Sequence, residues 1–361
     1  MTKKAPTTVG NCTVAEHGAR VHSTTSDIQR AVQVLRNGGL VAFPTETVYG
    51  LGADAENHNA VERIFTVKGR PATHPLILHI GSADDLTIWT DKVPLAARRL
   101  AEHFWPGPLS LVLNRSRRVS SAVTGGLETV AVRVPAHPVA LALIRSFGGA
   151  LAAPSANRFG AVSPTAARHV RDELGDAIDL VLDGGLCAVG VESTIVDATG
   201  EELCILRPGG LSREDLEGAL GHAISMRTTA GSVRVPGSHA SHYAPRAEVI
   251  FVDPTRLASE AENQASHGHQ VGVLLPHNIE IEHVPVLRVL RAPQSLADYG
   301  RMLYPMLREF DRCGCDVICV SLPVEEGIGV AIADRLRRAA GPRNLPERNR
   351  VAVKCHEPEE S

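Results

Sequence analysis

Several features that would assign this chain of 361 residues to a class at first sight are missing. No run of apolar residues approaches the roughly 20 that an α-helix needs to cross a membrane. The amino-terminal segment also lacks the apolar core of a signal peptide. We therefore expect a cytoplasmic protein with no membrane segment, and we expect residues 1–22 to form a flexible polar tail.

An excess of charge of one sign is also missing. The chain has 37 Lys and Arg against 40 Asp and Glu, a net charge of −3, whereas a general nucleic-acid-binding protein is usually basic. This balance gives no sign of disorder, and an apolar content of 43% supports well-packed cores. At this length the chain is long enough for two domains.

Paired cysteines and familiar catalytic motifs are absent as well. The seven cysteines include no C-x-x-C pair, whereas a zinc site usually takes its four ligands from two spaced pairs. Cys313, Cys315 and Cys319 lie close together, but Cys319 falls in the apolar run Val317–Val320, so we expect buried structural thiols. The P-loop, the G-x-S-x-G elbow and the H-E-x-x-H motif are all missing. We expect no obvious protein nucleophile and no metal ligands from side chains.

The richest stretch of polar chemistry follows the first apolar run. The run Leu40–Phe43 predicts a buried strand, and apolar residues at helical spacing predict a helix over Ala60–Val67. Residues 44–52 between them form a loop rich in hydroxyl groups and closed by glycines, and Lys68 and Arg70 follow the helix. Hydroxyl groups and cations at element ends suit an anionic, phosphate-bearing ligand. Taken alone, Lys68 and Arg70 are better explained as solvated charges.

Two polar residues lie within predicted strands, and each allows two interpretations. A lone histidine such as His79, in the strand Leu76–Ile80, is more often a satisfied core residue than a ligand contact. Arg133 lies in the alternating segment Glu128–Val134, which predicts a strand with one face in water. An arginine among apolar neighbours is rarely left unpaired. Arg133 therefore pairs with a protein carboxylate or binds a ligand carboxylate.

Helix starts carry further hydroxyl groups. Thr25 or Ser26 is predicted to cap the helix that Gly38 ends, and Ser212 is predicted to cap a helix through Leu220. Ser163 begins a Ser-Pro-Thr sequence predicted to cap a helix through Leu174. Because a helix amino terminus is a natural phosphate site, Ser163 is an N-cap, a phosphate ligand or both.

The chain divides into two predicted α/β domains. Residues 23–221 alternate many short strands with about five or six helices, which indicates a twisted, mixed sheet. Residues 222–246 lack periodicity and form a predicted linker. Residues 247–343 alternate strands and helices regularly, which is typical of a smaller, parallel, doubly wound domain. Residues 344–361 are expected to form a polar tail.

An ordered set of motifs extends from the first strand to the end of the linker. They are PTETVYGLG and KGRP in the stretch from Pro44 to Pro71, then PGPLS (Pro106–Ser110), AVRVP (Ala131–Pro135), APSAN (Ala153–Asn157), SPT (Ser163–Thr165), ESTIVD (Glu192–Asp197), LRPG (Leu206–Gly209) and HYAP (His242–Pro245). In this order the motifs resemble the YrdC/Sua5 family, the threonylcarbamoyl-AMP synthases. The resemblance implies a YrdC-like catalytic domain followed by the Rossmann-like C-terminal domain of the longer Sua5 branch.

The resemblance also implies a reaction. L-threonine and bicarbonate form N-carboxy-threonine, whose new carboxylate attacks the α-phosphate of ATP to give threonylcarbamoyl-AMP and pyrophosphate. Mg²⁺ is expected on the ATP, with no prosthetic group. A separate tRNA threonylcarbamoyl transferase would use the product to modify the adenosine next to the anticodon. A weak contact of this chain with tRNA stays open.

Site residues follow from the resemblance by matching motifs. The residues expected around L-threonine are Thr47, His79, Arg133, Ala153 and Ser193, with Arg133 pairing the threonine carboxylate. The residues expected around ATP are Lys68, Arg70, His74, Thr129, Ser155, Ser163, Arg207 and Tyr243, with Lys68 and Arg70 stabilising charge in the transition state.

Three positions depart from the family's pattern. His74 replaces the usual Asn, and Asp334 replaces an Asn in the last helix. In the family the linker folds over the active site, but the segment Ser238–Ser241 lacks the basic residues common in relatives. This puts in doubt how strongly the linker binds phosphate.

Other function classes are compatible with parts of the pattern. A carbamoyl transferase of the hydrogenase-maturation type contains a similar domain, but it would need an acylphosphatase-like module and zinc-finger cysteines. A protein that binds double-stranded RNA or tRNA would use the cationic cleft for a phosphate backbone, and its binding would depend strongly on salt. A nucleotide-sensing regulator would bind ATP without threonine-dependent turnover.

Overall fold

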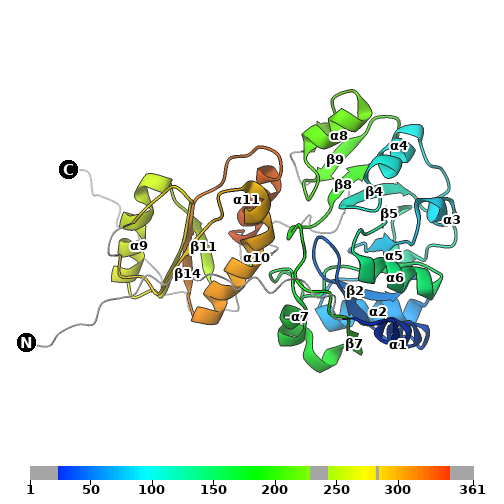
Figure 1. The fold of residues 1–361 in the computed structure, drawn as a ribbon, viewed down its shortest axis with the longest axis horizontal. Helices are drawn as coiled ribbons and strands as arrows, with labels where there is room; N and C mark the ends of the chain where they lie inside the picture. Colours follow the sequence, from blue (N-terminus) through cyan, green and yellow to red (C-terminus); the bar gives the residue numbers. More distant parts are fainter. Residues whose placement is uncertain (1–22, 228–242, 282–283, 342–361) are drawn as a thin grey trace, which may run out of the picture.

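The computed structural model describes residues 23–227, 243–281 and 284–341. Figure 1 shows a larger lobe built from the first part of the chain and a smaller lobe built from the last part. The predicted tails, residues 1–22 and 344–361, lie outside the described residues, and so does most of the predicted linker, residues 228–242. None of the described helices is long and apolar enough to span a membrane.

The larger lobe is organised around one ten-stranded mixed sheet. Its strands follow the order β10-β9-β8-β4-β5-β3-β6-β2-β1-β7. Their bounds are β1 Val41–Phe43, β2 Gly50–Asp54, β3 Ile77–His79, β4 Leu109–Asn114, β5 Thr129–Arg133, β6 Leu151–Ala152, β7 Leu180–Val181, β8 Thr194–Asp197, β9 Cys204–Arg207 and β10 Ser225–Met226. The predicted mixed sheet is therefore confirmed, but β10 lies inside the predicted linker, because Ser225 and Met226 pair in parallel with β9.

Helices cover both faces of this sheet. Their bounds are α1 Thr25–Arg36, α2 His58–Lys68, α3 Leu86–Trp89, α4 Leu95–Phe104, α5 Ser121–Thr124, α6 Pro138–Phe147, α7 Ala167–Leu174 and α8 Arg213–Leu220. Apolar residues of α1 and α6 form one core cluster, and those of α2, α4, α7 and α8 belong to another. The described part of this lobe has more helices than the five or six predicted, because α3 and α5 are single turns too short to show periodicity.

The glycines at positions 50 and 52 begin a strand, which corrects the prediction of a closed loop. β2 pairs antiparallel with β1, and Leu51 lies opposite Ala42. A side chain at Gly52 would place its Cβ 2.8 Å from Cε1 of Phe43. The missing side chain therefore makes room for the Phe43 ring in the core. Glycine here marks close packing within the sheet.

β5 is buried on both faces, so the prediction of one wet face is wrong. The strand lies between β4 and β3 in the middle of the sheet. Ala131 and Arg133 are as thoroughly buried as Val130 and Val132 on the other face. A polar residue alternates with apolar ones here because Arg133 pairs with the buried Glu46 inside the protein, and not because one face of the strand contacts water.

Two predicted helix caps move and one is confirmed. The cap of α1 is Thr24, whose side chain accepts a hydrogen bond from the backbone N–H of Asp27 in a capping box. Helix α7 begins only at Ala167 and has no side-chain cap, so Ser163 is not its N-cap. Ser212 caps α8 as predicted.

The smaller lobe is a parallel sheet with helices on both faces, as predicted. Its elements are β11 Glu248–Phe251, α9 Leu257–Ser266, β12 Val271–Leu275, β13 Arg288–Arg291, α10 Leu296–Cys313, β14 Val317–Val320 and α11 Gly329–Ala339. The strand order is β11-β14-β12-β13, with every pairing parallel. Helix α9 packs on one face, and α10 and α11 pack on the other, toward the larger lobe (Figure 1). Cys315 and Cys319 are buried, as expected of structural thiols, whereas Cys313 is only partly buried, which corrects the expectation for that residue.

We expect Gly52→Ala to destabilise the larger lobe. The new methyl group would overlap the Phe43 ring, and overpacking of a core typically costs about 1–3 kcal/mol. Urea unfolding measures the change. Gly218→Ala, on the exposed side of α8 with no atom near its Cβ, is the matched control and should gain about 0.5–1 kcal/mol. Equal unfolding free energies for the two variants would contradict this interpretation of β2.

Candidate active site

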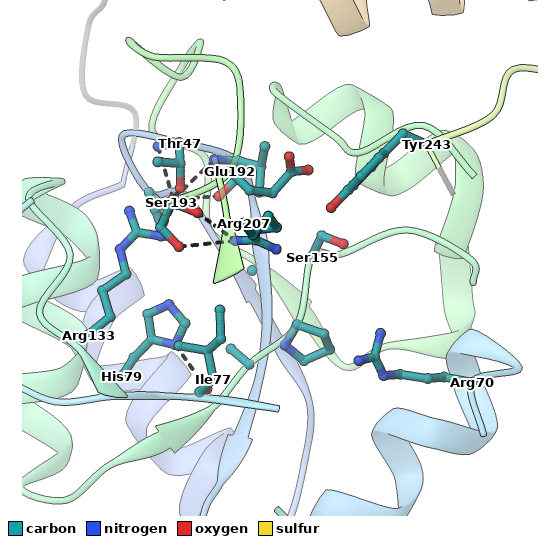
Figure 2. A pocket seen from close by; sticks show the side chains of 15 residues that line it. Thr47, Arg70, Ile77, His79, Arg133, Ser155, Glu192, Ser193, Arg207 and Tyr243 are labelled. Carbon is teal, nitrogen blue, oxygen red and sulfur yellow. Dashed lines mark hydrogen bonds between the residues drawn. The ribbon is translucent and has the colours of Figure 1, made fainter. Parts of the chain in front are cut away.

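One pocket of the larger lobe collects residues from several elements (Figure 2). The predicted residues that line it are Thr47, Arg70, His79, Arg133, Ala153, Ser155, Ser193, Arg207 and Tyr243. All five residues expected around threonine are among them, as are four of the eight expected around ATP. Six further residues line the pocket although no site role was predicted for them. They are Thr45, Val48, Gly50, Ile77, Pro154 and Glu192.

The register of the sheet explains why distant residues meet in this pocket. β3 and β5 are parallel neighbours, and His79 lies opposite Arg133 at their carboxyl ends. β6 runs antiparallel beside β3 and leads into Ala153. Because β6 is antiparallel, Ala153 lies beside Ile77, and its N–H donates to the carbonyl oxygen of Ile77. The pocket therefore extends along β3 from Ile77 to His79, and its lining includes residues from both ends of that strand.

Arg133 has a protein carboxylate as a partner, as the first of the two interpretations of this residue predicted. Its Nη2 donates to Oε1 of Glu46 at 2.7 Å and its Nη1 donates to Oγ1 of Thr47 at 2.9 Å. Its Nε donates to the carbonyl oxygen of Gly107. These contacts use one N–H of each nitrogen, so Nη1 and Nη2 each retain a second N–H. The pair with Glu46 fixes the guanidinium group at the wall of the pocket.

His79 is held as a neutral ring. Burial, together with the charge of Arg133, lowers the pKa of His79 to about 3. Its Nδ1 lies 3.3 Å from the carbonyl oxygen of Ile77, and its ring meets the ring of Phe43 edge to face. At neutral pH His79 therefore offers shape and a ring nitrogen but no positive charge.

Ser193 and Arg207 form the opposite wall. Nη2 of Arg207 donates to the carbonyl oxygen of Ser193 at 2.8 Å and to its Oγ at 3.2 Å. The Ser193 hydroxyl also shares a hydrogen bond with that of Ser110. Burial lowers the pKa of Arg207, which is almost completely enclosed. Arg207 thus anchors the segment before β8 while its charge faces the pocket.

Arg70 is a buried cation whose hydrogen bonds within the described residues are incomplete. Its Nη2 donates to the carbonyl oxygen of Pro75, but its Nε has no hydrogen-bond partner there. Burial lowers the pKa of Arg70 to about 10, so the group stays charged at neutral pH. A buried donor without a partner is costly. An anionic ligand in the pocket would supply that partner.

Lys68 does not line the pocket but supports it from behind. Its Nζ donates to the carbonyl oxygens of Ser155 and Asn157. Burial lowers the pKa of Lys68 well below the usual value, and Arg70 adds to this effect. The lysine therefore positions the small-residue loop that forms one wall, and its direct contact with ATP stays a prediction.

The other three residues expected around ATP lie outside the pocket lining. Ser163 donates to Oε1 of Glu192 at 2.6 Å and so acts behind the wall. The ring of His74 lies 5.3 Å from that of Phe159. Thr129 lies at the far end of β5 from Arg133 and is partly exposed.

Glu192 is the main pocket residue that sequence reasoning missed. Besides Ser163, its carboxylate accepts hydrogen bonds from Tyr304 and from Nε of Arg335, both in the smaller lobe. Burial alone would raise the pKa of Glu192, but the charges of Arg335 and Arg207 outweigh it, and the pKa is lowered. The signal was present in the ESTIVD motif, where Glu192 precedes Ser193, but its partners lie more than a hundred residues away.

The pocket is equipped to bind and orient anions. Within the described residues no pocket hydroxyl bonds to a histidine or a carboxylate, so none is activated as a nucleophile. Likewise, the part of the chain that the structure describes has no group of three or more His, Cys, Asp or Glu that could hold a metal. Three arginines supply positive charge instead.

The chain matches known proteins over most of its length. Residues 33–209 match a family model described as "Telomere recombination", and residues 211–341 match one described as "Threonylcarbamoyl-AMP synthase, C-terminal domain". Threonylcarbamoyl-AMP synthase of Pyrococcus abyssi is 43% identical over 87% of this chain and 94% of that protein. The Bacillus subtilis protein of the same name is 40% identical over 88% and 93%. The chain belongs to the threonylcarbamoyl-AMP synthase family.

A solved member of this family has the same fold. The crystal structure of P. abyssi Sua5 complexed with L-threonine superimposes with a TM-score of 0.83 at 42% identity, and the match covers 87% of this chain and 94% of that one. The predicted family, a family of nucleotidyltransferase enzymes, is therefore confirmed, as is the two-part α/β fold with a C-terminal Sua5 domain.

We expect His79 to make folding stability depend on pH. The pKa of His79 in the folded protein, about 3, lies below the usual 6.5. Between these pH values the unfolded chain therefore binds a proton at His79 that the folded protein does not bind. Stability is full above about pH 6.5 and falls as the pH drops toward 3, by up to roughly 3 kcal/mol at pH 4.5.

Urea unfolding of the wild type and of His79→Phe at pH 7.5 and pH 4.5 measures this effect. The variant should lose less stability between the two pH values. His169, whose pKa burial also lowers to about 3, remains in both proteins, so the loss is reduced and not abolished. The same loss in both proteins would show that His79 is not held neutral.

Proposed function

We propose that this chain is an L-threonylcarbamoyladenylate synthase that condenses L-threonine, bicarbonate and ATP. The observation that carries the proposal is the convergence of Arg70, Arg133 and Arg207 on one pocket in which the described residues include no activated nucleophile. Such a pocket suits two anionic substrates that react with each other. The family membership and the threonine complex of a relative 42% identical support the same choice.

In the proposed reaction the substrate supplies the nucleophile. The amino nitrogen of threonine bonds to the carbon of bicarbonate and water is lost, which gives a carbamate. A carbamate oxygen then bonds to the α-phosphorus of ATP while the bond from that phosphorus to the bridging oxygen breaks. Pyrophosphate leaves and threonylcarbamoyl-AMP remains. Positioning and charge stabilisation supply most of the catalysis for phosphoryl chemistry of this kind.

Threonine would occupy the end of the pocket near Arg133. The second N–H groups of its Nη1 and Nη2 are suited to the amino-acid carboxylate. Thr47 and Ser193 would contact the polar groups of the substrate, and Ala153 leaves space beside them. The neutral ring of His79 closes this end without adding a charge that would compete with Arg133.

ATP would occupy the end near Arg70 and Arg207. Their guanidinium groups would neutralise charge as the α-phosphate reacts, and the Nε of Arg70 would gain the partner that it lacks. Ser155 and Tyr243 line the same end. Lys68 would act through the loop that it holds and Ser163 through Glu192, and His74 and Thr129 would reach only the outer parts of the nucleotide.

Magnesium would enter as part of the substrate. The carboxylates of Glu46 and Glu192 near the pocket are both paired with arginines, so neither is an available metal ligand. Mg²⁺ bound to the triphosphate would neutralise part of its charge. The product would pass to a separate tRNA threonylcarbamoyl transferase, and the chain would act in the cytoplasm.

The first test is pyrophosphate release from ATP. We expect release only when L-threonine and bicarbonate are both present, because the carbamate needs both, and L-serine serves as the control amino acid. Omitting either substrate should reduce release to background. ATP binding without threonine-dependent release would rule out the proposed activity and favour a nucleotide sensor.

Arg70→Met tests the proposed role of that cation. Turnover should fall by about 10²–10³-fold, the range found when one donor to a developing oxyanion is removed, while the melting temperature changes little. Arg63→Met is the matched control, since Arg63 lies exposed on the preceding helix and pairs with Asp179 away from the pocket. Turnover of Arg70→Met at the control's level would show that Arg70 has no part in charge stabilisation.

A further inference from the structure

The smaller lobe inserts two side chains behind the pocket. Tyr304 from α10 and Arg335 from α11 both reach the carboxylate of Glu192. Arg335 has no exposed surface and is the largest of the fully buried side chains in the described structure. Because both residues come from the other lobe, docking of the two lobes completes the surroundings of a residue that lines the pocket.

Arg335 is held by contacts from all three of its nitrogens. Nε donates to Oε2 of Glu192 at 2.7 Å, Nη1 donates to the carboxylate of Asp334, and Nη2 donates to the carbonyl oxygen of Pro208 at 3.0 Å. Pro208 directly follows Arg207. The same side chain therefore neutralises Glu192 and fixes the backbone that carries the pocket arginine.

Arg335 also supports Tyr243. The centre of its guanidinium group lies 4.9 Å from the centroid of the Tyr243 ring, a cation–π contact. Tyr243 also stacks on Tyr304, with 5.9 Å between the ring centroids. Tyr243 has a left-handed backbone with φ of 62°, which is unfavourable for a residue other than glycine. Packing against Arg335 and Tyr304 therefore stabilises Tyr243, a residue of the pocket wall, in an unfavourable backbone conformation.

Glu192 has two arginines within reach of its charge. Both Arg335 and Arg207 act electrostatically on its carboxylate and lower its pKa. Among the described residues, only Arg335 forms an ion pair with it at hydrogen-bond distance. Without Arg335, the negative charge of Glu192 would be balanced chiefly by Arg207, the cation that faces the proposed nucleotide.

We propose that Arg335 is a positioning residue of the active site, which neutralises Glu192 and braces Tyr243 so that the charge of Arg207 acts on the phosphates of ATP. This inference rests on the proposed function for the identity of the ligand. The C-terminal domain then supplies the cation that balances the charge of Glu192 at the active site. Arg335 touches no substrate and acts through Glu192, Tyr243 and the Arg207–Pro208 backbone.

The test measures ATP affinity directly in the full chain, by calorimetry without threonine or bicarbonate. Arg335→Met leaves the charge of Glu192 without its ion pair, and we expect ATP affinity to fall by about tenfold or more, the effect of about 1.4 kcal/mol. Adding Glu192→Gln to this variant removes the unpaired charge. ATP affinity of the double variant should return to within about threefold of wild type, a rescue that lost packing alone would not give.

Kinetics give a second readout. In the pyrophosphate assay Arg335→Met should raise KM for ATP more than KM for L-threonine, and the double variant should reverse most of that rise. Arg337→Met is the matched control, because Arg337 lies on the same helix and pairs with Glu325 at the surface. It should bind ATP as the wild type does.

The outcomes separate this inference from the proposed function. Wild-type ATP affinity in a folded Arg335→Met variant, or failure of Glu192→Gln to restore affinity, would overturn the role of Arg335. If Arg335→Met does not fold, the double variant decides, since it leaves no buried charge unpaired. ATP binding that follows this pattern in a protein without threonine-dependent release would reject the proposed reaction and retain the inference.

Discussion

The buried ion pairs of arginine are the interaction on which the site depends. Arg70, Arg133, Arg207 and Arg335 are all almost completely enclosed, while only two carboxylates of the described residues, Glu46 and Glu192, are buried with them. Enclosed cations need partners, because leaving water is costly for a charge. Backbone carbonyl oxygens of Pro75, Gly107, Ser193 and Pro208 supply the remaining contacts. The result is a rigid pocket in which cations outnumber buried anions, and that imbalance suits anionic substrates.

The sheet provides the rigidity that such an arrangement requires. The parallel pairing of β3 with β5 fixes His79 beside Arg133, and the β8–β9 pair fixes Ser193 against Arg207. At Gly209 even a methyl group would meet the backbone of Ser193 and Thr194 at less than 2.5 Å. The segments on each side of the pocket are therefore locked by backbone contact. Small displacements of the arginines, which would weaken the site, are resisted by the fold itself.

The sequence predicted the elements with strong periodicity and the residues that lie in motifs. The parallel C-terminal sheet, helix α2 and the lining residues Arg70, Ser193 and Arg207 were all predicted. β2 was missed because its two glycines look like a turn, while their actual role depends on the ring of Phe43. The motif predicted a contact of Lys68 with ATP, but its contacts with the carbonyl oxygens of Ser155 and Asn157 could not be predicted, because backbone oxygens carry no sequence signal. Arg335 was assigned no role from the sequence, because its partner Glu192 lies 143 positions away.

The two buried carboxylates are balanced in different ways, and the difference links the lobes to the chemistry. Glu46 pairs with Arg133 inside the larger lobe, so that pair depends only on the main sheet. Glu192 pairs with Arg335 across the lobe boundary, and Arg308 adds a second cross-lobe pair with Glu173 at 2.7 Å. A change that loosens the docking of the lobes would therefore alter the charge at the Arg207 end before it unfolds either sheet. The placement of the lobes and the charge balance of the pocket therefore depend on the same ion pairs, whose residues come from both halves of the chain.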